Sequence, residues 1–233
     1  MNTRINRSDL IKKIAVCGMF AALAYVCVCV FRIKVMFLTL DIKDAITTVA
    51  AMLLGPIAGV TISLIVALIE MLTISETMFY GFIMNFLSSA TLSVVASLIY
   101  RSKRSLFSAV LGLVTASVSV TAVMMLANLL ITPFYMGVSS GEVAALIPKV
   151  LLPFNLTKAV LNCSITMIIY KPISTAMVRA GIIKKTHSGD GKSYGLSVKT
   201  VAVTLSALAV LAICLVIFNV VLNAEISFFN IKP

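Results

Sequence analysis

The chain alternates between long apolar runs and short polar segments. The long runs cover residues 10–30, 57–72, 78–100, 106–131, 149–170 and 201–221, with a shorter run at 45–54. Most approach the ~20 residues that an α-helix needs to cross a hydrocarbon layer ~30 Å thick. The pattern therefore predicts an all-α integral membrane protein.

Breaks between the runs set the number of crossings. Gly55-Pro56 separates the second run from the third, because glycine loosens the backbone and proline lacks an N–H donor. An extended stretch at 35–40 follows the first run. The fifth run is expected to stop at Pro133 and the sixth near Pro172, with a loop at 134–148 between them. Seven crossings result.

The basic residues orient these crossings. With the N-terminus in the cytoplasm, most positive charges fall on the inner side, as the positive-inside rule requires. The inner residues are Arg4, Arg7, Lys12, Lys13, Arg101, Lys103, Arg104, Lys171, Arg179, Lys184, Lys185, Lys192 and Lys199. The seventh crossing then puts the C-terminus outside the cell. The predicted location is the cell membrane.

Composition supports this interpretation and excludes several classes of function. The chain is 61% hydrophobic and only 12% charged, well outside the range of soluble domains. Its net charge of +11 lies between apolar runs, so it indicates topology and not nucleic-acid binding. Cysteines and histidine show no metal-ligand spacing, and no phosphate-binding loop is present. We expect no metal, no cofactor, no enzymatic activity and no intrinsic ATP hydrolysis.

Several polar residues are predicted to meet near the outer surface. Glu70, Asn128, Asn155 and Lys158 fall at one depth in this topology, and Asp41 and Asp44 open the second helix at the same level. Charged groups inside a membrane are costly, and amides and ammonium groups offer several hydrogen bonds. A pocket for a polar solute is therefore expected. Alternatively, Lys158 or Glu70 could extend toward the headgroups, or Asn128 could bridge two helices.

Four stretches of the chain resemble a known family. They are Phe37-Leu-Thr-Leu-Asp-Ile-Lys-Asp44, Leu53-Leu-Gly-Pro-Ile-Ala-Gly59, Asn128-Leu-Leu-Ile-Thr-Pro-Phe-Tyr135 and Leu152-Pro-Phe-Asn-Leu-Thr-Lys158. In these stretches the chain resembles the substrate-binding S-components of the energy-coupling factor (ECF) vitamin transporters, and most of all their riboflavin-specific members. The resemblance covers about residues 9–185.

The resemblance implies a domain organisation and a site. Residues 1–185 would form the six-helix membrane domain, 186–199 a cytoplasmic polar linker, and 200–233 an additional transmembrane helix with a short tail. The vitamin, most simply riboflavin as transported ligand, would be held near the outer face. The implied substrate-binding residues are Asn128, Asn155, Lys158, Leu38, Leu40, Asp41, Glu70 and Phe154.

The resemblance also implies partners. These are a transmembrane coupling protein and two cytoplasmic ATPases, which would drive release of the vitamin. Gly18 and Ala22 are four residues apart on the first helix, a spacing that lets helices approach closely in lipid. With Ala15 and Val26 they form the implied docking face for the coupling protein.

Three departures from the family pattern leave alternatives open. Riboflavin members usually carry Lys-Asn where this chain has Glu70-Met71, and a common lysine is replaced by Thr39. The run at 201–221 is an addition. Another vitamin or a flavin analogue is therefore an alternative ligand. A stand-alone ion-coupled carrier and a membrane-embedded lipid enzyme are alternatives of other classes.

Overall fold

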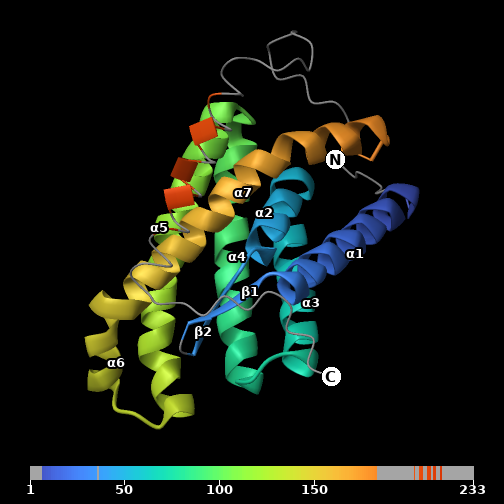
Figure 1. The fold of residues 1–233 in the computed structure, drawn as a ribbon. Helices are drawn as coiled ribbons and strands as arrows, with labels where there is room; N and C mark the ends of the chain where they lie inside the picture. The colour runs from blue at the N-terminus through green and yellow to red at the C-terminus, as the bar shows by residue number, and fades with distance from the viewer. Residues whose placement is uncertain are drawn as a thin grey trace.

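The protein is a bundle of helices with one small β-hairpin (Figure 1). The computed structural model describes residues 7–35 and 37–182, with isolated positions between 202 and 216. The elements are α1 (Arg7–Val30), β1 (Arg32–Val35), β2 (Leu38–Asp41), α2 (Lys43–Leu54), α3 (Pro56–Thr73), α4 (Met78–Lys103), α5 (Leu106–Met136), α6 (Ser140–Leu146), the π-helical turn η1 (Ile147–Leu151) and α7 (Leu152–Arg179). The predicted linker and the extra C-terminal helix lie outside the continuously described residues.

Five segments are long and apolar enough to cross a membrane. They are 10–30, 56–73, 78–103, 106–136 and 140–179. Large apolar side chains such as Ile57, Phe107 and Leu130 are mostly exposed on the outside of the bundle, where lipid would cover them. The predicted all-α membrane fold is confirmed.

The short helix α2 lies inside this bundle and is surrounded by the longer helices (Figure 1). It has 12 residues, ten of them buried. At its end the chain reverses through Gly55, whose φ of 121° is a conformation that L side chains rarely adopt. Pro56 then begins α3, a position where its missing N–H breaks no helical bond. The predicted break between the second and third runs is thus a turn between two antiparallel helices.

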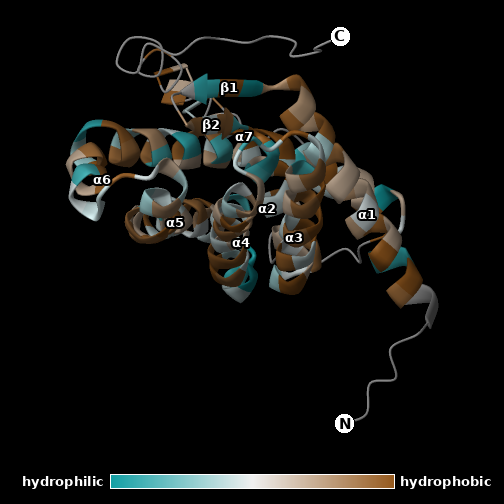
Figure 2. Ribbon diagram, turned by 90° about the horizontal axis from the view of Figure 1, so that it is seen from below, coloured by the Kyte–Doolittle hydropathy of each residue, from teal (hydrophilic) through white to brown (hydrophobic). Residues whose placement is uncertain are grey.

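The extended stretch after the first helix forms an antiparallel hairpin. Arg32 pairs with Asp41 at its base and Val35 with Leu38 near its tip. Ile33 and Leu40 are buried against Phe154 of α7. Figure 2, a view from this end of the molecule, shows the hairpin lying beside α7. These contacts fix the polar end of β2 within the bundle.

Two helices are longer than the proline positions predict. α5 continues through Pro133 to Met136, and α7 continues through Pro172 to Arg179. A proline removes one backbone hydrogen bond, and a long packed helix can lose one such bond and remain intact. The expected loop at 134–148 is also partly helical. Its helix α6 is capped by Ser139, whose hydroxyl accepts a hydrogen bond from the Glu142 N–H.

Glycines allow the central helices to pack closely. A Cβ atom at Gly112 of α5 would lie 2.9 Å from the backbone oxygen of Ala96 in α4. A Cβ atom at Gly59 of α3 would lie 2.7 Å from the Cβ of Ala51 in α2. Small residues at helix contacts are typical of membrane bundles, in which close van der Waals packing drives association.

Candidate functional site

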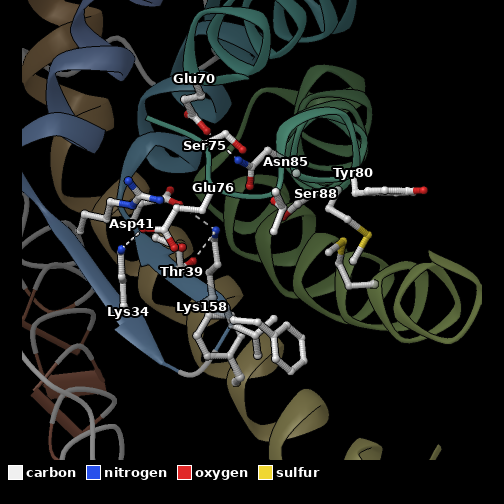
Figure 3. A pocket seen from close by; sticks show the side chains of 18 of the residues that line it. Lys34, Thr39, Asp41, Glu70, Ser75, Glu76, Tyr80, Asn85, Ser88 and Lys158 are labelled. Atoms are coloured by element: carbon white, nitrogen blue, oxygen red, sulfur yellow. Dashed lines mark hydrogen bonds and ion pairs between the residues drawn. The ribbon is translucent and has the colours of Figure 1, made fainter. Parts of the chain in front are cut away.

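A cavity of about 320 Å³ opens between the hairpin and the ends of α3, α4, α5 and α7 (Figure 3). The residues that line it come from each of these elements. They are Arg32, Lys34, Phe37, Leu38, Thr39, Asp41, Glu70, Ile74, Ser75, Glu76, Thr77, Tyr80, Gly81, Met84, Asn85, Ser88, Met124, Asn128, Tyr135, Phe154, Asn155 and Lys158. The cavity combines aromatic and sulfur-containing walls with amides, hydroxyls and charges, as small-molecule sites commonly do.

Four buried charges of alternating sign run from this cavity into the bundle. The Lys158 ammonium lies 2.8 Å from Oδ2 of Asp41 and donates a second bond to the Thr39 carbonyl. The Lys43 ammonium lies 4.0 Å from the same Asp41 oxygen. It also lies 2.7 Å from both carboxylate oxygens of Glu70. We call Lys158, Asp41, Lys43 and Glu70 the charge quartet.

The quartet balances its own charge, which is a condition for burying ions. Each of its four residues is no more than 7% exposed. Burial alone would raise the pKa of Asp41, but the ammonium groups of Lys158 and Lys43 lower that pKa below its usual value. Asp41 therefore remains ionised between its two cations.

Asn162 of α7 ties the quartet to the backbone. Its side-chain oxygen accepts from the N–H of Ala45, in the first turn of α2, at 2.9 Å. Its side-chain nitrogen donates to the backbone oxygens of Asp41 and Lys158. A helix start leaves N–H groups without intrahelical partners, and Asn162 supplies one from another helix. It thereby fixes α2 and β2 against α7.

Two further amides face the cavity from α5 and α7. The Asn128 nitrogen donates to the Met124 carbonyl and its oxygen accepts from the Thr132 hydroxyl. The Asn155 nitrogen donates to the Leu151 carbonyl. Each amide thus holds its orientation through its own helix and keeps further hydrogen-bonding capacity.

The mouth of the cavity is closed on one side by the hairpin. Arg32 donates to the Ile74 carbonyl at 3.0 Å, and Lys34 forms an ion pair with Glu76 in the α3–α4 loop. Phe37, in the turn of the hairpin, meets Tyr135 edge to face with ring centroids 6.0 Å apart. Aromatic and ionic contacts therefore join the hairpin to the rims of α3 and α5.

The sequence of this domain matches the family of ECF transporter substrate-specific components over residues 12–170. The chain belongs to this family. The curated protein "Riboflavin transporter RibU" of Staphylococcus aureus (strain TCH60) is 27% identical over 178 residues, which cover 72% of this chain and 93% of that protein. A solved structure described as the S component of a bacterial ECF transporter is 26% identical, with a TM-score of 0.63. That match covers 72% of this chain and 98% of the other.

Membership of the ECF family establishes the general role of the chain. ECF substrate-specific components are multi-pass proteins of the plasma membrane that bind a vitamin. They act with a membrane coupling protein and ATPase subunits. The family consists of transport proteins and not of enzymes.

This ECF component brings most of the residues singled out from the sequence to one cavity. Asn128, Asn155, Lys158, Leu38, Asp41, Glu70 and Phe154 all line it. Leu40 does not: it is fully buried and packs in the hydrophobic cluster with Ile33. Lys158 and Glu70 are 7% and 3% exposed, so neither extends toward headgroups.

Sequence reasoning missed three residues of this region. Lys43 was not among the predicted site residues, although it is buried in the quartet. Asn85 of α4 donates to the Glu70 carboxylate at 2.6 Å, and Figure 3 shows the two side chains pointing toward each other. Asn162 lies four residues after Lys158, on the same helical face. That spacing was a usable signal; nothing comparable marked Asn85.

The small-residue face of α1 points away from the bundle. Ala15, Gly18, Ala22 and Val26 are all exposed, whereas the other side of the helix contributes buried residues such as Phe20. A Cβ atom at Gly18 would meet nothing within 4 Å. Among the described residues this face contacts no other element closely, so it is available for a partner helix.

Proposed function

We propose that the chain is the riboflavin-specific subunit of an ECF importer, and that riboflavin binds in the cavity. The observation that carries the proposal is the meeting of Asn128, Asn155 and Lys158 around one cavity with aromatic walls. The name of the Staphylococcus aureus relative supports the choice of ligand.

The chemistry of the cavity suits a flavin. The isoalloxazine ring has apolar faces and one edge of alternating carbonyl and N–H groups. The amides of Asn128 and Asn155 can both donate and accept at such an edge, and the Lys158 ammonium can donate to a carbonyl. Phe154 and Tyr135 would contact the ring faces. The hydroxyls and carboxylates of the α3–α4 side suit the ribityl hydroxyls.

In this proposal the cavity faces the outside of the cell and the N-terminus lies in the cytoplasm. The basic residues at the end of α4, Arg101, Lys103 and Arg104, would then be cytoplasmic. A partner's ATP hydrolysis would drive release of the vitamin on the inner side.

The direct test is a titration of riboflavin with the purified full chain in detergent, measured by quenching of flavin fluorescence. We expect saturable one-to-one quenching. Thiamine, which lacks the tricyclic ring, should not compete. Absence of quenching, in protein that is folded and free of co-purified flavin, would refute the choice of ligand. Uptake by vesicles that contain this chain alone would refute the dependence on partner ATPases.

The exposed face of α1 gives a second test, this time of the partner. Gly18→Leu is expected to leave the isolated protein as stable as the wild type, because the added side chain enters open space. It should reduce co-purification with the coupling protein and ATPases at least about tenfold, since small faces permit close helix contact. The measurement is pull-down of the co-expressed complex, with thermal stability recorded alongside.

Leu23→Phe is the matched control for this variant. Leu23 is also exposed on α1, but five residues further along, about 140° around the helix from Gly18. It should assemble normally. Normal assembly of Gly18→Leu would show that this face is not the docking surface.

A further inference from the structure

Glu70 lines the cavity but has little freedom to bind a ligand itself. Both of its carboxylate oxygens lie 2.7 Å from the Lys43 ammonium, and one also accepts from Asn85 at 2.6 Å. It is 3% exposed. Its hydrogen bonds are directed at other protein groups, which indicates that it acts through them.

Glu70 is connected to Lys158 through Lys43 and Asp41, because both lysines lie near the same oxygen of Asp41. Oδ2 of Asp41 lies between two ammonium groups, 2.8 Å from Lys158 and 4.0 Å from Lys43. The two cations therefore compete for one carboxylate oxygen. Glu70 binds the Lys43 ammonium through two short contacts and so keeps it 4.0 Å from Oδ2 of Asp41.

We propose that Glu70 is a positioning residue: by holding Lys43, it leaves Asp41 to Lys158 and so sets the place of the Lys158 ammonium in the cavity. This inference rests on the proposed function, because its binding readout uses riboflavin.

Removal of the Glu70 charge should therefore lower the affinity for riboflavin, even though Glu70 does not contact the ligand. In Glu70→Gln, the two buried ammonium groups would both depend on Asp41 for their close carboxylate contact, with Asp44 as the other buried carboxylate of the region. Lys43 would move toward Asp41 and displace Lys158, because charges attract strongly where water is excluded. Asp44 and Asn85 face the same region, but in the described structure Asp44 accepts its hydrogen bonds from Ser88 and Ser89.

Rescue by a second substitution distinguishes positioning from direct contact. We expect Glu70→Gln to weaken riboflavin binding at least about tenfold. The double variant Glu70→Gln with Lys43→Met should recover most of that loss, because the Lys158–Asp41 pair then has no competitor. If Glu70 bound the ligand directly, removal of Lys43 would restore nothing. A double variant as weak as Glu70→Gln therefore overturns the proposal.

A second readout needs no ligand. Acetylation of lysines by a mild reagent, followed by mass spectrometry of the peptide that contains Lys158, reports how firmly its ammonium is held. Reactivity at Lys158 should rise several-fold in Glu70→Gln and return toward the wild-type value in the double variant. Unchanged reactivity in Glu70→Gln would overturn the positioning role even if riboflavin proved to be the wrong ligand.

Glu142→Gln is the matched control for both readouts. Glu142 is an exposed carboxylate in the first turn of α6, outside the lining of the cavity. It should behave as the wild type in riboflavin titration and in Lys158 acetylation. Thermal unfolding of every variant in detergent shows whether a loss of binding accompanies a loss of fold.

Discussion

Replacement of Lys158 by methionine is expected to weaken riboflavin binding by about 10- to 100-fold. A hydrogen bond made by a charged group is worth ~1.5–3 kcal/mol, and each 1.4 kcal/mol is about a factor of ten in affinity. The variant loses a donor that lines the cavity and the cation that lies 2.8 Å from Asp41. Quenching of flavin fluorescence measures the change.

The fold should survive this substitution, which makes the loss interpretable. Asp41 keeps Lys43 as a nearby cation and keeps the Asn162 contact to its backbone oxygen. Lys149→Met is the control: Lys149 is exposed in η1 and does not line the cavity. The control should bind riboflavin as tightly as the wild type. If Lys158→Met also bound as tightly, Lys158 would not be a ligand-binding residue.

Replacement of Gly112 by valine is expected to destabilise the bundle strongly. The new Cβ would lie 2.9 Å from the backbone oxygen of Ala96, and a backbone atom cannot rotate aside as a side chain can. Insertion of extra atoms into a well-packed core typically costs ~1–3 kcal/mol, occasionally more, and we expect the upper end here. Thermal unfolding in detergent and the yield of monodisperse protein measure the effect.

Gly18→Val isolates the packing contribution. Both substitutions put a β-branched residue in a helix interior, so their intrinsic helix propensities change alike. Gly18 has open space around it, whereas Gly112 faces α4. Equal unfolding temperatures for the two variants would contradict the close contact between α4 and α5.

Local patterns predicted the membrane-spanning architecture well, because run length and charge are properties of contiguous sequence. Gly55-Pro56 was recognisable as a turn for the same reason. Prolines were a weaker guide: α5 and α7 continue past Pro133 and Pro172, since a long packed helix can lose one hydrogen bond and remain intact. Whether a proline ends a helix depends on packing that the sequence does not display.

The cavity was only partly predictable. Topology alone put Asn128, Asn155 and Lys158 at one depth, and the structure brings these side chains around one space. The predicted topology could not pair Lys43 with Glu70, because that contact spans 27 residues and depends on the direction in which α2 enters the bundle. Leu40 was assigned to the site by resemblance, through the backbone of the stretch from Leu38 to Asp41; its side chain packs in a hydrophobic cluster and does not line the cavity.

The length of α2 helps to fix the position of the hairpin that borders the cavity. Twelve residues rise only ~18 Å, against ~30 Å for a hydrocarbon layer, so α2 is too short to cross such a layer by itself. The strand immediately before it carries Asp41 of the cavity lining and is held against α7 by Asn162. One added turn would lengthen α2 by ~5.4 Å, and we expect it to displace this strand and change the size of the cavity. A helix that does not line the cavity would thus influence which solute fits.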